Sequence, residues 1–176
     1  MKEYRPLILR SNRFLGSALV NKGIITSDML ETANQALLEV IQSDNLRQAS
    51  VLNILIYKMK AIQEADLIDK AIDELKVGVM DLKSYDCVKR VPADADPDFC
   101  WATWTVPFDC EDKILSLASV YCLCEPAVKA WQDKYPGCQL LWHAASMEDV
   151  FRELLALEER RTAAAAPGAE GAAKAG

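Results

Sequence analysis

The chain has 176 residues, a formal net charge of −6 and 51% hydrophobic residues. It is long enough to bury a core as one domain or two small ones, and its acidity disfavours nucleic acid as a partner. Charged residues interrupt each apolar stretch before the roughly 18 residues that a membrane span needs, and residues 1–13 lack a secretory apolar segment. We therefore expect a cytoplasmic protein that does not span a membrane.

Two helices joined by a glycine turn are predicted near the N-terminus. Residues 14–20 carry an apolar face at three-to-four spacing, and Gly23 follows where a helix needs a left-handed C-terminal residue. Thr26 offers an N-cap hydroxyl for the second helix, and Asp28 lies in its first turn. The predicted apolar stripe of the second helix is Met29, Leu30, Ala33, Leu37, Leu38 and Ile41.

A weaker copy of this unit follows at an offset of 37 residues, as Leu52 against Leu15 shows. Asn53 and Lys60 stand at the places of Gly16 and Gly23, so the apolar packing positions survive while the glycine positions do not. A left-handed backbone costs a long side chain only about 1–2 kcal/mol, so Lys60 can still make the turn. Residues 65–75 are predicted to form a further helix.

The apolar periodicity changes near residue 83. The runs WATWTVPF and KILSLASVYCLC predict two strands joined by a turn at residues 109–112. Pro126 suits the first turn of a helix that Pro136 and Gly137 end, and CQLLWHA predicts a third strand. Ser146 is a capping signal for a closing helix. The predicted apolar face of that helix is Met147, Val150, Phe151, Leu154 and Leu155.

Together these elements predict an α+β protein in three parts. Residues 1–83 form a helical module with a degenerate internal repeat, and residues 84–161 form a small α/β sandwich. In the sandwich, strand, strand, helix, strand and helix give a three-stranded sheet with helices on one face. Residues 162–176 are rich in alanine and glycine and are predicted to be a disordered tail.

No catalytic residue, metal site or cofactor is predicted. The six cysteines form no CxxC pair, and the single His143 cannot complete a familiar zinc-ligand pattern. We expect reduced, buried thiols, with Cys122 and Cys124 at strand spacing, and a partly buried structural His143. The tryptophans are expected in the core. The cysteines are Cys87, Cys100, Cys110, Cys122, Cys124 and Cys138.

Two regions of the sequence carry recognisable motifs. Residues 14–37 read FLGSALVNKGIITSDMLETANQAL. Residues 92–156 contain TWTVP, a helix start at Glu125 and Pro126, a YPG turn and SMEDV. In this order they resemble the N-terminal region of the type II secretion ATPases and their type IV pilus assembly relatives, whose first module carries a pattern close to RLGxxLVxxGxIxxxxLxxALxxQ. The matching positions are Leu15, Gly16, Leu19, Val20, Gly23, Ile25, Leu30 and Ala33.

The resemblance stops short of the ATPase core. The sequence contains no GxxxxGK[ST] phosphate loop, so we expect no ATP hydrolysis. Some family members bind cyclic di-GMP through two tandem copies of the glycine motif. The resemblance then implies a nucleotide site here at Leu15, Gly16, Leu19 and Leu30. Phe14 and Leu37, however, replace the arginine and glutamine that contact the ligand in those members.

We therefore expect a non-catalytic adaptor whose partner is a protein, either a secretion or pilus motor or a component of the inner-membrane platform. A cyclic di-GMP receptor is the alternative, because Arg10 and Arg13 can supply bidentate phosphate contacts. A thiol or metal-binding protein is the second alternative.

Overall fold

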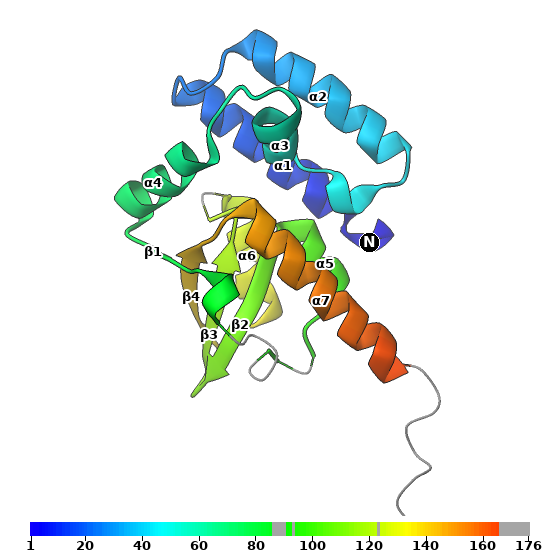
Figure 1. Cartoon of the computed structure of the whole chain (residues 1–176), viewed down its shortest axis with the longest axis vertical. Coiled ribbons are helices and arrows are strands. Elements are labelled where there is room, and N and C mark those ends of the chain that lie inside the picture. The colour runs from blue at the N-terminus through cyan, green and yellow to red at the C-terminus, as the bar shows by residue number, and fades with distance from the viewer. Residues whose placement is uncertain (86–90, 93, 123, 166–176) are drawn as a thin grey trace, which may run out of the picture.

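The computed structural model describes residues 1–85, 91–92, 94–122 and 124–165. Helices α1 to α4 form one half of the molecule, and the strands with α5 to α7 form the other (Figure 1). The α-helices are α1 (Arg5–Asn21), α2 (Ser27–Gln42), α3 (Val51–Asn53), α4 (Glu64–Leu75), α5 (Pro97–Thr103), α6 (Glu125–Lys134) and α7 (Met147–Ala165). Shorter helical turns are η1 (Lys2–Tyr4), η2 (Leu46–Gln48), η3 (Ile54–Lys58) and η4 (Leu82–Ser84).

The sheet has four strands in the order β1-β4-β3-β2: β1 (Gly78–Val79), β2 (Thr105–Glu111), β3 (Ile114–Ser119) and β4 (Gln139–Ala144). Strands β2 and β3 are antiparallel, whereas β4 runs parallel to both β3 and β1. The predicted α+β class is confirmed, but the predicted three-stranded sheet is wrong by one strand. Strand β1 was missed because two residues are too few to show a period of two.

Helices lie on both sides of this sheet. In Figure 1, α7 passes in front of the strands and α6 lies behind them. Both faces are apolar: Leu115 and Leu117 point to one side, while Val106 and its cross-strand neighbour Ala118 point to the other, and all four are buried. Since each apolar face needs a cover, the expectation of helices on one face only is corrected.

The predicted turn between the first two helices is confirmed. Gly23 has φ +66°, its N–H donates to the carbonyl of Val20 at 2.9 Å, and Ile24 donates to Leu19 at 3.0 Å. The hydroxyl of Thr26 then caps α2 by accepting a hydrogen bond from the N–H of Met29 at 3.2 Å. Cap chemistry is local, so the sequence pattern alone locates this turn.

The apolar stripe of α2 is narrower than predicted. Ala33, Leu37 and Ile41 are buried, but Met29 is 37% exposed and Leu38 is 53% exposed. These two side chains lie at the edges of the stripe. They contribute apolar surface to the outside of the helical half.

The second copy keeps the left-handed turn without glycine, because Lys60 has φ +52°. The helix before it is wound differently, however. The N–H of Met59 donates to the carbonyl of Ile54 at 2.8 Å, which is the i→i−5 bond of a π-helical turn. Asn53, at the place of Gly16, ends the short α3 that precedes this turn.

The first predicted strand of the sheet half begins too early. Residues 97–103 form α5 instead, because the side chain of Asp96 caps the helix by accepting from the N–H of Asp98 at 3.0 Å and Pro97 stands at its first position. Trp104, with φ +47°, ends α5, and β2 starts at Thr105. Local capping thus overrides the aromatic and β-branched character of WATW.

The hairpin turn is also displaced from residues 109–112. Strand β2 continues to Glu111, which pairs with Ile114, so Asp112 and Lys113 make the turn with φ +48° and +66°. Positive φ at two residues other than glycine gives no compositional signal. Cys122 and Cys124 lie beyond the end of β3, and Cys124 is the N-cap residue of α6, so their predicted strand spacing is wrong.

The predicted start of α6 and the predicted cap of α7 are confirmed, but the apolar face of α7 is narrower than predicted and the helix runs four residues into the predicted tail. Pro126 stands in the first turn of α6, and Ser146 Oγ accepts from the N–H of Asp149 at 3.1 Å. Phe151 and Leu155, on the predicted apolar face of α7, are 38% and 39% exposed. Helix α7 extends to Ala165, and the remainder of the predicted tail, residues 166–176, lies outside the described residues.

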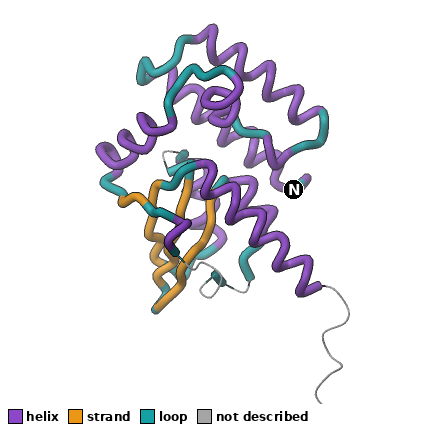
Figure 2. Tube along the Cα trace, in the orientation of Figure 1, coloured by secondary structure: helices purple, strands orange, loops and turns teal. Residues whose placement is uncertain are grey.

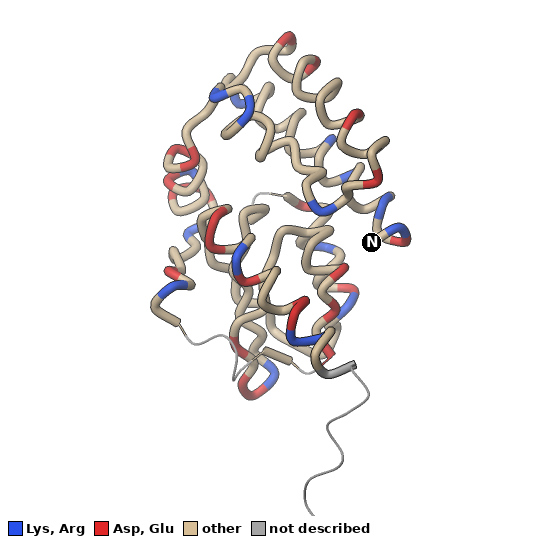
Figure 3. The backbone as a smooth tube through the Cα atoms, turned by 45° about the vertical axis from the view of Figure 1, so that its right-hand side comes forward, with Lys and Arg blue, Asp and Glu red and all other residues tan. Residues whose placement is uncertain are grey.

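One hydrophobic cluster runs through both halves, from Leu7 of α1 to Leu157 of α7. Trp101, Trp104 and Trp131 are buried in it as predicted, and Trp142 is half-buried. Figure 2 shows the helices of α1 to α4 gathered at one end of the strands. Within the described ranges no helix combines the length and apolarity needed to cross a bilayer. The charged residues of α1 are all basic, whereas those of α2 are all acidic (Figure 3).

Candidate functional site

The glycine motif lies where α1 meets α2. A Cβ placed on Gly16 would lie 2.5 Å from Cδ1 of Leu30, closer than real Cβ contacts come. Gly16 is buried and Leu30 is half-buried. The missing side chain of Gly16 therefore makes room for Leu30 of the same chain, and the glycine serves the packing of α1 against α2.

The four predicted nucleotide-site residues do not share one surface. Leu30 lines the outer groove between α1 and α2, next to Gly16. Leu15 and Leu19, each 5% exposed, instead line the cavity between α1, α4 and the sheet. The structure thus brings Gly16 and Leu30 together and places Leu15 and Leu19 on another side of α1.

The outer groove between α1 and α2 has a volume of about 490 Å³ and mixes hydrogen-bonding with apolar side chains. A second hollow of about 480 Å³ continues it along the helices and shares Ser17, Leu30, Asn34 and Leu38 with it. Amide and hydroxyl groups can orient a polar ligand, and the exposed Leu38 can cover an apolar one. The residues that line the outer groove are Ser17, Val20, Asn21, Ser27, Leu30, Glu31, Asn34, Gln35 and Leu38.

The two arginines near the motif differ in position. Arg13 lines the continuation of the outer groove, and within the described part of the chain it forms no ion pair. Phe14 lines a different groove beside α4. Arg13 is therefore the cation that the structure places at the groove, and Arg10 lies on the surface of the same helix.

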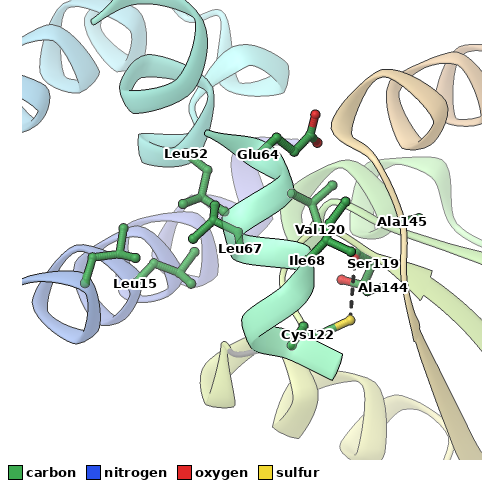
Figure 4. A pocket seen from close by; sticks show the side chains of 12 residues that line it. Leu15, Leu52, Glu64, Leu67, Ile68, Ser119, Val120, Cys122, Ala144 and Ala145 are labelled. Atoms are coloured by element: carbon green, nitrogen blue, oxygen red, sulfur yellow. Dashed lines mark hydrogen bonds between the residues drawn. The ribbon is translucent and has the colours of Figure 1, made fainter. Parts of the chain in front are cut away.

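A small cavity of about 40 Å³ lies beneath α4 (Figure 4). Leu15, Leu52 and Leu67 line one side of it, and the ends of β3 and β4 line the other. A volume of this size holds about one water molecule, so the cavity is too small for an organic ligand. It marks imperfect packing between α4 and the sheet.

The thiol of Cys122 at this cavity is a hydrogen-bond donor. Its Sγ donates to the carbonyls of Ser119 and His143, both at 3.2 Å. Burial raises the pKa of the Cys122 thiol to about 12 and also raises the pKa of Cys100. These groups are protonated at neutral pH, which removes the thiolate that nucleophilic or metal chemistry requires.

The other predicted candidates are dispersed. Cys100, Cys122 and Cys124 are buried, Cys110 is exposed, Cys138 is half-buried, and Cys87 falls outside the described residues. The half-buried ring of His143 packs edge-on against Phe108 with 5.2 Å between centroids, which fits its predicted structural role. Among the described residues, no group of three or more His, Cys, Asp or Glu side chains could hold a metal ion.

Sequence reasoning missed a buried amide that joins the two copies of the motif. Asn12 of α1 is 2% exposed, and its Nδ2 donates to the carbonyls of Ile8 and Ala49, each at 2.9 Å. Its Oδ1 accepts from the N–H of Val51 at 2.6 Å, at the start of α3. The only signal in the sequence is an asparagine on the apolar side of α1, three residues before Leu15.

A second buried hydrogen bond links the helical half to the sheet half. The hydroxyl of Tyr121, which follows β3, donates to Ser50 Oγ at 2.9 Å, and Ser50 Oγ also accepts from the N–H of Asn53 at 3.2 Å. The carboxylate of Glu64 bonds the N–H of Met147 at the start of α7. These bonds hold the α3 and α4 region against the sheet in one arrangement.

No family model matches the chain, and a search of curated proteins found no match. Among solved structures, the N-terminal domain of XpsE is 16% identical, with a TM-score of 0.51 over 79% of this chain and 90% of that one. The structure of MshE with cdg is 18% identical, with a TM-score of 0.48 over 81% of this chain and 96% of that one. The resemblance that the sequence motifs indicate is thus confirmed for the fold, which is that of the XpsE N-terminal domain.

Proposed function

We propose that this chain is a non-catalytic docking module that presents rigid surfaces to a protein partner in the cytoplasm. The observation that carries the proposal is the contact between Gly16 and Leu30. The most motif-like part of the sequence is used for internal helix packing, so its role is to build a scaffold.

Two further features support this function. Buried hydrogen bonds join the two copies of the motif through Asn12 and join the helical half to the sheet half through Tyr121, which suits a body that keeps its shape when a partner binds. Exposed large apolar side chains, including Leu38 at 53% and Tyr57 at 49%, are available for contact. Such residues are typical anchors of protein interfaces when they cluster.

The partner class follows from the family resemblance. We propose a secretion or pilus motor, or a component of the inner-membrane platform, as the docking partner. We also propose that residues 1–83 and residues 84–161 act as two units of the scaffold, a helical unit and a sheet unit. The fold shared with the XpsE N-terminal domain supports this assignment.

A pairwise binding assay tests the proposal. The purified full chain is immobilised, and the soluble domains of type II secretion and type IV pilus platform and motor proteins are passed over it one at a time. We expect one of them to bind with a Kd in the micromolar range or tighter, and we expect no ATP turnover by the chain alone. Turnover at a motor-like rate, or binding of none of these proteins, would contradict the docking role.

A cyclic di-GMP receptor is the second candidate, and the outer groove favours it. Arg13 and the amide of Asn34 lie along this groove and can bond phosphate and base edges. Titration calorimetry of the chain with cyclic di-GMP, beside an Arg13→Gln variant, tests this function. Heat from the unaltered chain that the variant lacks would support a receptor, and no heat from either at high micromolar ligand would exclude one.

A further inference from the structure

Strand β4 is paired on both sides for only part of its length. Along β3 its register is continuous from Gln139 to Ala144. On the other side, β1 pairs with His143 and Ala144 alone. The first four residues of β4, 139–142, therefore form an open edge next to β1, and Figure 1 shows β4 at the margin of the larger strands. We call residues 139–142 the open edge.

The backbone hydrogen bonds of β4 show which of its backbone groups face outward. Gln139 donates to the carbonyl of Lys113 at 2.7 Å and Ala145 donates to Ser119 at 3.3 Å, so the odd-numbered residues face β3. The N–H of Met80 donates to the carbonyl of Ala144 at 2.9 Å, so the even-numbered residues face outward. Successive residues of a strand alternate in this way.

Three groups remain on the open edge. In a parallel pair, a residue bonds the carbonyl before and the N–H after its opposite residue. Gly78, opposite His143, therefore uses the carbonyl of Trp142. The N–H and carbonyl of Leu140 and the N–H of Trp142 are left, and within the described ranges none of the three has a protein partner.

The side chains around these groups are apolar. Leu141 is 46% exposed, Val79 of β1 is 53% exposed, and Ile114 of β3 is 41% exposed. Edge strands are usually protected from other chains by charge, proline or a bulge, yet residues 139–142 read QLLW. The open edge therefore has both the backbone groups and the apolar surface that strand addition uses.

Two lysines lie near the ends of the open edge. Lys113, whose carbonyl accepts from the N–H of Gln139, lies across β4 on the β3 side, within reach of a long side chain, and Lys76 precedes Gly78 by two residues. Both are exposed, and neither forms an ion pair with any residue that the structure describes. The charge at the two ends favours an incoming segment with acidic residues flanking apolar ones.

We propose that the open edge binds an extended, apolar segment of a partner protein with acidic ends, added parallel to β4 and in line with β1. The segment's residue opposite Leu141 donates to the carbonyl of Leu140 and accepts from the N–H of Trp142. Its residue opposite Gln139 accepts from the N–H of Leu140. This inference rests on the docking role and names the kind of segment that docks.

A second copy of this chain fits the open edge less well. In an antiparallel pair of two β4 strands, outward residues must face outward residues. Pairing centred on Leu141 would put Gln139 of the second copy opposite His143, where Gly78 already lies. Pairing centred on Leu140 allows only two backbone hydrogen bonds between the two copies. A peptide parallel to β4 uses all three groups and meets neither obstacle.

The test uses the full chain, labelled for NMR, and three synthetic probes: Ac-EVTVTVE-NH2, its lysine counterpart Ac-KVTVTVK-NH2, and the interrupted Ac-EVTPTVE-NH2. We expect the first peptide to shift the amides of Leu140 and Trp142 and to slow their hydrogen exchange. It should bind at least five-fold more tightly than the other two. Equal binding by all three peptides, or shifts confined to α1 and α2, would overturn the proposal.

Leu140→Pro supplies the decisive variant. It removes one outward N–H while leaving the bonds to β3 intact, a place where strands accept proline, and Leu140→Val is the matched control. We expect binding to fall at least five-fold in the first variant and less than two-fold in the second. If the near-ultraviolet circular dichroism of Leu140→Pro shows that this variant does not fold, the amide shifts of the unaltered chain with the first peptide decide whether the open edge binds.

Two outcomes separate this inference from the docking role. If a platform or motor protein binds the chain and Leu140→Pro equally well, docking stands and the open edge is wrong. If sedimentation shows a dimer that Leu140→Pro dissolves, the occupant is a second copy and the proposal fails. If no protein binds at all, the docking role and the open-edge proposal both fail.

Discussion

The contact between Gly16 and Leu30 predicts a reversal of sign in a double-mutant cycle. In Gly16→Ala, the new Cβ would lie 2.5 Å from Leu30 Cδ1, more than 1 Å inside the roughly 3.5–4.0 Å of an ordinary carbon contact. The atom in the way is the end of a half-buried leucine side chain that can rotate, so the cost lies in the lower part of the roughly 1–3 kcal/mol of overpacking. Alanine within a helix gains about 1 kcal/mol over glycine. The net loss in the free energy of unfolding is therefore about 0–1 kcal/mol.

Removing the obstructing side chain should reverse the effect. In a Leu30→Ala background the space beside Gly16 is open, so Gly16→Ala should stabilise the chain by about 0.5–1 kcal/mol through helix propensity alone. The coupling energy of the cycle is then about 1–2 kcal/mol. Urea unfolding followed by circular dichroism, with equal m-values for all four proteins, measures it.

Gly23→Ala is the matched control. Gly23 has φ +66° and a Cβ there would meet nothing within 4 Å, so its cost of about 1–2 kcal/mol comes from the backbone and should be the same in both backgrounds. If Gly16→Ala has one effect whether residue 30 is leucine or alanine, Leu30 does not fill the space beside Gly16. The main support for a scaffold role would then be lost.

Three further outcomes are expected. Asn12→Leu leaves the buried N–H of Val51 without its acceptor and should cost about 2–4 kcal/mol in urea unfolding; a loss below about 1 kcal/mol would contradict the role of the amide. Burial alone would raise the pKa of Asp96, but the hydrogen bond from Tyr4 at 2.6 Å and backbone N–H donors hold it below the ordinary value. The carboxylate therefore stabilises the fold above the unfolded pKa of about 3.9, and this stability is lost as pH falls through the lower folded pKa. Tyr4→Phe should be less stable at pH 6, with the difference vanishing near pH 2; a difference independent of pH would refute this. Thiol labelling at pH 8 should modify the exposed Cys110 before the buried cysteines, and Cys110→Ser should remove one fast-reacting thiol.

Local chemistry explains which parts of the fold were predictable. The turn at Gly23 and the cap at Thr26 depend on neighbours within a few residues, and the structure confirms both. The turn at Lys60 also followed from the repeat, because the apolar positions on either side of it match those around Gly23. Such features are visible in sequence because their causes lie close together along the chain.

The missed elements have causes that lie elsewhere in the fold or give no pattern. Strand β1 forms because it pairs with β4, and a segment of two residues shows no sequence pattern that predicts this pairing. The hairpin turn at Asp112 and Lys113 uses positive φ without glycine.

The candidate site shows the same limit. The structure brings Gly16 and Leu30 of the motif into contact, but that Leu15 and Leu19 face another side of α1 depends on where α4 and the sheet lie.

The chain path through β1 determines how the protein can be divided. Strand β1 precedes residue 83, so a cut at that residue would leave β1 with the helical fragment and take the outer strand from the sheet fragment. The sheet fragment would then expose the outward groups of β4 along the whole strand. Mixing the two fragments should restore the missing strand by complementation, and fragments intended to fold separately should be cut before Val77.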